Sequence, residues 1–320
     1  MPASTRVIRR RIKSVENTKK ITRAMEMVAA SKLKKLQDLL KQSDRYIGEL
    51  GRILGTLVRE KPLAHPLLER REEIKNVLAF LIASDAGLCG SYNTNLFDQT
   101  NRFTSAVPGP ARFVAIGKQS AAFLKRNRLS VIDELHIPRP QEMDGLIEAV
   151  TKIAVDEFQS KRTDQVIFIY TKVVSLGSLK PATEQLFPFA SGTSLRSSKP
   201  SKAEAIPTEI ASSGPSVGRP RLPAGKAGND ESVIDYIIEP SLEDILEIVI
   251  PEFIQAQIGQ FVKHSLVAEQ ASRMMAMRQA TDNASEMIDS LTLARNKARQ
   301  ASITKELLEV VSGSRALHMK

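Results

Sequence analysis

The sequence of 320 residues has a single cysteine, four histidines and no tryptophan, and only 5% of its residues are aromatic. One cysteine excludes an internal disulfide, because a disulfide needs two. The histidines are scattered and have no close Cys or His neighbour, which argues against a zinc site. The low aromatic content favours helix-rich over sheet-rich packing. With 42% hydrophobic and 26% charged residues, the chain has the composition of a folded protein.

Signals for membrane insertion and secretion are also scarce. The apolar run at residues 77–83 falls far below the roughly 18 residues that a membrane-spanning helix needs. The basic N-terminal segment lacks the apolar core of a signal peptide. An Arg-rich transit sequence is the alternative, but the same pattern continues past residue 40. We therefore expect the chain to stay in the compartment in which it is made.

Proline is missing from both ends of the chain. Residues 3–61 and 252–320 contain none of the sixteen prolines, and these are the stretches where long helices can form, since an interior proline costs about 3 kcal/mol. Apolar residues recur there at three- and four-residue spacing, which predicts helices over residues 4–57 and 251–312. At 1.5 Å per residue these helices would be roughly 80 and 90 Å long. They would outreach a globule of this size, so we expect them to project from it as an antiparallel coiled coil.

The middle of the chain alternates between two patterns. Short β-rich runs are separated by segments of helical periodicity, which predicts a doubly wound, Rossmann-like α/β domain with a parallel sheet. The expected strands are residues 77–83, 112–116 and 166–170, with 233–238 as a candidate further strand, and the expected helices are residues 92–103, 119–126 and 145–158.

These patterns divide the chain into three parts. We expect an N-terminal coiled-coil helix in residues 1–60, the α/β domain in 61–240 and a C-terminal coiled-coil helix in 241–320. Within the domain, 18 of the 39 residues in 191–229 are Gly, Pro or Ser and none is aromatic. Such a stretch buries too little apolar surface to offset its ordering entropy, so we interpret it as a mobile surface insertion.

Residues 84–93, Ser-Asp-Ala-Gly-Leu-Cys-Gly-Ser-Tyr-Asn, follow the first expected strand and open a helix. Nucleotide-binding folds cradle phosphate at this position. The segment is neither GxGxxG nor a Walker loop, and it lacks a lysine. A tight strand-to-helix turn that needs glycine for its backbone is therefore the favoured interpretation. Cys89 has no His or Lys nearby in sequence to activate it, so we expect a small buried side chain.

The net charge of +10 is concentrated near the N-terminus, where residues 4–41 carry twelve Lys or Arg against three acidic residues. A cationic stripe of this kind could follow nucleic-acid phosphates. However, residues 4–41 contain no aromatic side chain that could stack on a base. Docking onto acidic protein surfaces explains the same charge.

Six of the nine methionines fall in two patches, one on each of the two expected end helices, amid small residues that allow two helices to approach closely. The product would be a thin, stiff rod, and we expect some of its Met and Leu side chains to face outward onto a partner. No paired catalytic carboxylates, metal-ligand spacing or Ser-His arrangement is evident in the sequence. The chain therefore looks like a mechanical or scaffolding part. The methionines are Met25, Met27, Met274, Met275, Met277 and Met287.

Four segments resemble the gamma subunit of rotary, F-type ATP synthases. They are IKSVENTKKITRAMEMVAASK at 12–32, SDAGLCG at 84–90, the block at 271–283 and NKARQASITKEL at 296–307, which matches the family's signature. The resemblance implies a central stalk: the coiled coil stands inside a hexamer of alternating alpha and beta subunits. The α/β domain then sits on the proton-driven membrane ring beside the epsilon subunit. It further implies a non-catalytic chain with no cofactor, metal or small-molecule substrate.

The resemblance also implies which residues contact partners. Met25 matches the residue that faces the lever segment of the beta subunits, and Arg273 lies in the Met-rich block coupled to the first helix. The insertion at 191–229 lacks the Cys pair of the redox hairpin in photosynthetic members, so thiol control is not expected. The residues matching those that contact the catch loops of the hexamer are Arg299, Gln300, Thr304 and Glu306.

Two functions of different classes therefore stand at this point. The first is a rotor subunit that transmits torque in a proton-translocating ATP synthase, peripheral to the cytoplasmic face of a bacterial inner membrane or an equivalent organelle membrane. The second is a basic coiled-coil scaffold for nucleic acid. Co-purification with a hexameric ATPase would decide for the first, and specific affinity for DNA or RNA at moderate salt for the second.

Overall fold

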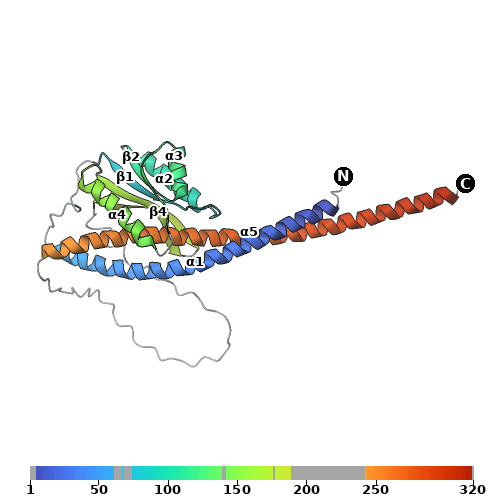
Figure 1. Cartoon of the computed structure of the whole chain (residues 1–320), viewed down its shortest axis with the longest axis horizontal. Coiled ribbons are helices and arrows are strands. Elements are labelled where there is room, and N and C mark those ends of the chain that lie inside the picture. The colour runs from blue at the N-terminus through green and yellow to red at the C-terminus, as the bar shows by residue number, and fades with distance from the viewer. Residues whose placement is uncertain are drawn as a thin grey trace, which may run out of the picture.

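Two long helices form a rod, and an α/β domain lies against one side of that rod (Figure 1). Helix α1 (Thr5–Glu60) and helix α5 (Leu242–His318) run antiparallel, as the sequence predicts. The computed structural model describes residues 5–60, 67, 74–107, 109–138, 142–175, 177–188 and 242–318. The insertion at 191–229 and the candidate strand at 233–238 lie outside these residues, and the three domain boundaries stay predictions.

Cross-helix contacts fix the register of the rod. Thr281 Oγ1 donates to Thr22 Oγ1 over 2.8 Å, and Tyr46 donates to a Glu252 carboxylate oxygen over 2.9 Å. Residues that come later in α1 therefore pair with residues that come earlier in α5. Figure 1 shows α5 continuing alone past the N-terminal end of α1. Two helices thus make the shaft of the rod, and α5 alone makes its tip.

Helix α5 begins at Leu242, nine residues before the predicted start at residue 251. Pro251 therefore lies inside the helix rather than at its beginning. The prediction treated proline as a boundary, since an interior proline loses a backbone hydrogen bond at a cost of about 3 kcal/mol. Here Ile250, Phe253 and Ile254 are buried around it. Burying one such side chain contributes about 1.5–3 kcal/mol, so together they outweigh the penalty.

Length and hydropathy alone would allow one part of α5 to be read as a membrane span. The same part of the helix packs against α1 and the α/β domain, where Ile258, Phe261 and Val262 are buried. A buried core helix of a folded domain can thus have the length and hydropathy of a membrane-spanning helix.

The domain is built on one five-stranded sheet, whose strands lie in the order β3-β2-β1-β4-β5. The first four strands are parallel, and β5 is antiparallel to β4. The strands are β1 (Val77–Ile82), β2 (Ala111–Ile116), β3 (Ser130–Leu135), β4 (Gln165–Ser175) and β5 (Ser178–Phe187). The helices are α2 (Tyr92–Ala106), α3 (Lys118–Arg126) and α4 (Met143–Gln159). The three expected strands and three expected helices are confirmed within a few residues, except that β4 runs on to Ser175.

Strands β3 and β5 were not expected from the sequence. Both lie at the edges of the sheet, where pairing on one side only relaxes the need for an apolar sequence. β3 carries Asp133 and Glu134, and β5 contains Pro181, a residue that edge strands tolerate. Because β5 is antiparallel, the sheet is mixed rather than wholly parallel as predicted.

Helices cover both faces of the sheet, which confirms the doubly wound architecture. Alternate β1 side chains, such as Ala79 and Leu81, pack with α2 and α3. The other β1 side chains, Leu78, Phe80 and Ile82, join a larger core with α4, α5 and α1. The rod is therefore one layer of the domain, because α5 packs directly on the sheet.

Gly117 connects β2 to α3 and has a φ of +97°, a backbone conformation that L side chains rarely adopt. A Cβ at this position would also clash with the carbonyl oxygen of Ala83. We expect Gly117→Ala to lower the free energy of unfolding in urea by more than about 2 kcal/mol. Gly145→Ala is the matched control, since Gly145 lies in α4 with open space around its Cβ position. The control should be neutral or stabilising by up to about 1 kcal/mol.

Candidate functional site

The tip of α5 presents side chains to the surroundings and to no other part of the described chain. Every residue from 301 to 312 is exposed, and its large apolar side chains are 49–71% exposed. Exposed apolar surface of this extent marks an interaction site, so the expectation of outward-facing apolar side chains is confirmed. The apolar residues of the tip are Ile303, Leu307, Leu308, Val310 and Val311.

Four of the predicted contact residues lie on or beside this tip. Arg299, Gln300, Thr304 and Glu306 all have exposed side chains. Their hydrogen bonds are made within α5: Thr304 donates to the Gln300 carbonyl over 3.0 Å, and Glu306 accepts from Ser302 over 3.2 Å. These contacts leave the outer face of the helix available to a partner.

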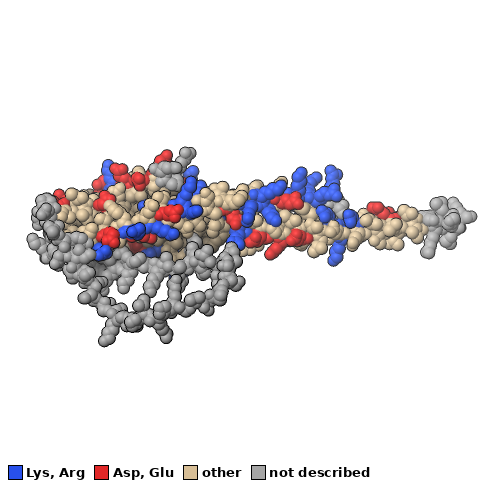
Figure 2. All heavy atoms as spheres, turned by 90° about the horizontal axis from the view of Figure 1, so that it is seen from below, with Lys and Arg blue, Asp and Glu red and all other residues tan. Residues whose placement is uncertain are grey.

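The positive charge of the N-terminal segment lies on the rod rather than on the domain. Figure 2 shows Lys and Arg side chains gathered along the rod toward the end where α1 begins. Arg9, Arg10 and Lys13 are exposed there, whereas Ile8 and Ile12 are buried between the two helices. Helix α1 is thus amphipathic here, with an apolar seam toward α5 and an exposed cationic face.

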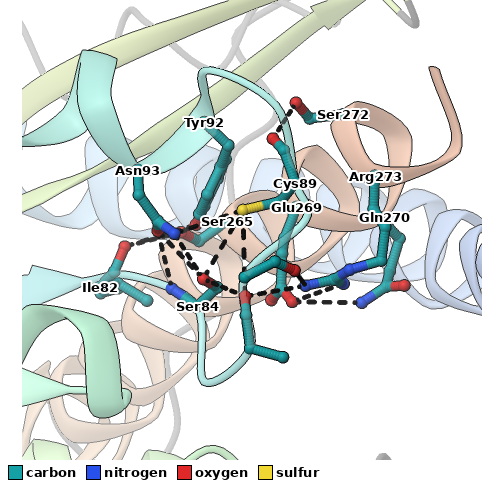
Figure 3. Close-up of polar contacts among 12 residues, drawn as sticks. Ile82, Ser84, Cys89, Tyr92, Asn93, Ser265, Glu269, Gln270, Ser272 and Arg273 are labelled. Carbon is teal, nitrogen blue, oxygen red and sulfur yellow. Dashed lines mark hydrogen bonds and ion pairs between the residues drawn. The ribbon is translucent and has the colours of Figure 1, made fainter. Parts of the chain in front are cut away.

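The other two predicted residues, Met25 and Arg273, lie on the paired part of the rod. Met25 is half-buried. The Arg273 side chain is turned inward and is only 9% exposed as a residue. Its Nη2 donates to the carbonyl oxygens of Ala86 at 3.1 Å and Gly87 at 3.4 Å (Figure 3). Arg273 therefore has an internal partner, the 84–93 loop, and its contact with another subunit stays a prediction.

Several side chains join the 84–93 loop to α5 (Figure 3). Ser272 donates to the Cys89 carbonyl over 2.6 Å, and Ser265 donates to the Ile82 carbonyl over 3.1 Å. Tyr92 and Ser265 share a buried hydrogen bond of 2.7 Å between their hydroxyls. We call this set, with Arg273 and its two carbonyl contacts, the loop clamp. Its members are 173 to 187 positions apart in the sequence, so no local motif signals it.

The loop clamp encloses a buried ion pair. Arg273 Nη1 lies 2.7 Å from a Glu269 carboxylate oxygen, one helical turn earlier in α5. Burial raises the pKa of the Glu269 carboxyl, and the neighbouring Arg273 guanidinium offsets part of that rise. A buried charge left without its partner costs several kcal/mol, so each member of this pair depends on the other.

The loop itself behaves as a structural turn. Gly90 adopts a φ of +58°, and a Cβ there would meet Ser272 Oγ at 3.4 Å and Ala276 Cβ at 3.5 Å. Cys89 is 2% exposed and packs with Tyr92 and Ala268, which confirms that it is a small buried side chain. The carbonyls of the loop are used by α5, as expected for a turn that serves packing. Among the described residues, no group of three or more His, Cys, Asp or Glu is placed to hold a metal ion.

His264 lies at the contact between the rod and the domain. Its Nδ1 accepts from the Val173 backbone N–H over 3.4 Å, and burial lowers its pKa below the usual value of 6.5. Asp44 on α1 and Glu184 on β5 oppose this shift, and Lys172 on β4 adds to it. The unfolded chain therefore takes up a proton at this residue before the folded chain does.

We expect the free energy of unfolding to fall as the pH drops below about 6.5, with His264 contributing at most about 1.4 kcal/mol per pH unit. The sign follows from the lowered pKa: stability is complete above 6.5 and is lost on the acid side. Urea unfolding at pH 7.5 and 5.5 should show a smaller difference for His264→Gln than for the native chain. His136→Gln, which changes an exposed histidine, should leave the difference unchanged.

Comparisons with known proteins agree with this geometry. A family model described as ATP synthase matches residues 4–317. The ATP synthase gamma chain of Dehalococcoides mccartyi is 36% identical over 98% of this chain and 99% of its own length. The chain belongs to the ATP synthase gamma chain family. The gamma chain of a Janthinobacterium species is similar as well, at 35% identity over 98% of this chain and all of its own length.

Solved structures share the fold. The rotor of the Euglena gracilis mitochondrial ATP synthase aligns with a TM-score of 0.56 over 94% of this chain and 99% of its own, at 15% identity. The central stalk of the Tetrahymena thermophila mitochondrial enzyme aligns with a TM-score of 0.52 over 81% of this chain and 99% of its own, at 21% identity. The resemblance seen in the sequence is thus confirmed, with the fold class and the expected role of a non-catalytic central-stalk subunit. The comparisons give the nucleic-acid alternative no support.

Proposed function

We propose that this gamma chain transmits torque between a membrane ring and a catalytic hexamer of alpha and beta subunits. The observation that carries the proposal is the shape of the rod: α5 outreaches α1, and every described side chain of its tip from 301 to 312 is exposed. The opposite part of the rod is built into the α/β domain through one continuous apolar core. Such a chain can be held at one end and act at the other.

The contact surfaces differ in chemistry, which suits a rotor. The apolar tip fits a nonpolar bearing, where contacts need no fixed register. The cationic face of α1 fits acidic segments of the hexamer, where charge steers without locking one orientation. Met25, Arg299, Gln300, Thr304 and Glu306 are the residues we assign to contacts with the hexamer. Each orientation of an asymmetric rod would favour a different state of each nucleotide site.

At the other end, the α/β domain would meet the membrane ring, with the epsilon subunit beside it. The similar solved structures are a central stalk with its c-ring and a rotor of mitochondrial ATP synthases, which supports this arrangement. The chain would then lie at the membrane surface, on the cytoplasmic face of a bacterial inner membrane or its organelle equivalent. Neither the domain nor the rod would need to enter the lipid.

Purification of the full chain with its bound partners tests the proposal. Mass identification should find the alpha, beta and epsilon subunits and the ring protein in a stable complex that hydrolyses ATP. A preparation that carries DNA or RNA at moderate salt, and no ATPase, would contradict the proposal.

A further inference from the structure

The loop clamp lies where the rod leaves the domain. Ser265, Ser272 and Arg273 of α5 bond to the end of β1 and to the loop that follows it. Among the described residues, Arg273 is the most C-terminal residue of α5 that hydrogen-bonds to the domain. The next cross-element bond along α5, from Thr281, reaches α1 instead. Among the described residues, the loop clamp is therefore the hydrogen-bonded connection between α5 and the domain that lies nearest to the free part of the rod.

The apolar core between the domain and the rod is close-packed, which already resists relative movement of the two. The hydrophobic effect itself is roughly proportional to buried area and has no direction. Hydrogen bonds weaken steeply as their angle departs from linearity, so the loop clamp adds a directional restraint to that packing. A rotor needs such a restraint at the exit of its shaft.

We propose that Arg273 is the positioning residue of this rotor: it locks the 84–93 loop to α5, so that the domain and the rod turn as one body. This inference rests on the proposed function, because only a chain under torque needs such a lock. Arg273 holds Glu269 with Nη1 and two loop carbonyls with Nη2 at the same time. A lysine has one ammonium group and no rigid fork, so it cannot reproduce this arrangement.

Cys89 provides a direct probe of the lock in the full chain. It is the only cysteine of the sequence, it lies in the clamped loop and it is 2% exposed. Its rate of labelling by a maleimide should therefore follow the population of chains in which the loop has left α5. We expect Arg273→Ala to raise this rate at least about tenfold, the change that loss of one charge-assisted hydrogen bond implies. Arg278→Ala, at an exposed arginine of α5, should not change the rate.

An engineered disulfide tests the mechanical role in the assembled ATP synthase. A Cβ built at Gly90 lies 3.5 Å from the Ala276 Cβ, within the range of about 3.5–4.5 Å that disulfides require. Gly90→Cys with Ala276→Cys, in a Cys89→Ser background, should therefore fasten the loop to α5 when oxidised. The reference is the chain that carries both engineered cysteines and an intact Arg273. It includes any strain that the substitution causes at Gly90.

We expect Arg273→Ala to lower the number of protons pumped per ATP hydrolysed, with hydrolysis itself retained. Oxidising the engineered disulfide should restore that ratio to the reference, and reducing it should remove the restoration. If the single variant fails to assemble because Glu269 is left unpaired, Glu269→Gln with Arg273→Ala removes both charges and takes its place in the same test.

The inference is overturned if Arg273→Ala leaves Cys89 labelling and proton pumping at native values, or if the oxidised disulfide restores nothing. A failure of the proposed function has a different signature. In that case removal of the α5 tip would leave proton pumping normal, whereas a failure of the Arg273 inference alone would not alter the effect of that truncation.

Discussion

Removing residues 299–320 should lower coupled ATP synthesis by more than about tenfold while the rest of the chain stays folded. Contacts at protein interfaces that matter are worth more than about 1 kcal/mol each, and 1.4 kcal/mol corresponds to a factor of ten. The deleted segment includes four of the assigned contact residues and the exposed apolar side chains of the tip. Losing even two such contacts would therefore abolish most of the preference of the rod for one state of each nucleotide site.

The truncation leaves the fold of the chain intact for a structural reason. The side chains of residues 301–312 are exposed, so their loss uncovers no core. The urea midpoint of the truncated chain should match that of the native chain, which separates a coupling defect from unfolding. The measurements are ATP synthesis and ATP-driven proton pumping in membrane vesicles. Normal pumping by a complex with the truncated chain would count against the rotor.

Replacing Phe261 by Ala should lower the free energy of unfolding by about 3–5 kcal/mol, the cost of an emptied aromatic site in a core. Phe261 is buried on α5, with ring centroids 5.0 Å from Phe168 and 4.9 Å from Tyr170 of β4. Phe261 therefore packs α5 directly against β4. Aromatic pairs of this geometry add to what area burial alone contributes.

Urea unfolding of the full chain measures this effect, and Ile248→Ala is the matched control. Ile248 is also an apolar residue of α5, but it is 73% exposed, so its replacement should change the free energy of unfolding by less than about 0.5 kcal/mol. Equal losses for the two variants would show that the packing of α5 on the sheet contributes little to stability.

Periodicity predicted the rod because long helices depend on regular local signals. Proline-free stretches with apolar residues every three or four positions leave few alternatives to a helix, and the antiparallel pairing follows from their places at the two ends. The limit of this reasoning is Pro251, where burial of the surrounding side chains outweighs a local penalty. The buried strands β1, β2 and β4 were predictable for a similar reason, since each contains a continuous apolar run: VLAFLI in β1, FVAI in β2 and VIFIY in β4.

The features that the sequence could not predict depend on distant partners. Strands β3 and β5 carry charges or proline and are defined by the neighbour with which they pair. Arg273 was assigned to a partner subunit by resemblance, and its contacts with the 84–93 loop join residues more than 180 positions apart in the chain. Exposure of the α5 tip was foreseen only as a general property of the rod. Which of the two helices extends beyond the other depends on the register in which they pair.

Rotation of the domain under ATP hydrolysis tests the central claim most directly. A probe can be attached through Lys152→Cys, at an exposed position of α4, in a Cys89→Ser background, with the catalytic hexamer fixed to a surface. Adding ATP should turn the probe continuously in one direction about the long axis of the rod. A probe that stays in one orientation while the hexamer hydrolyses ATP at its normal rate would contradict the account.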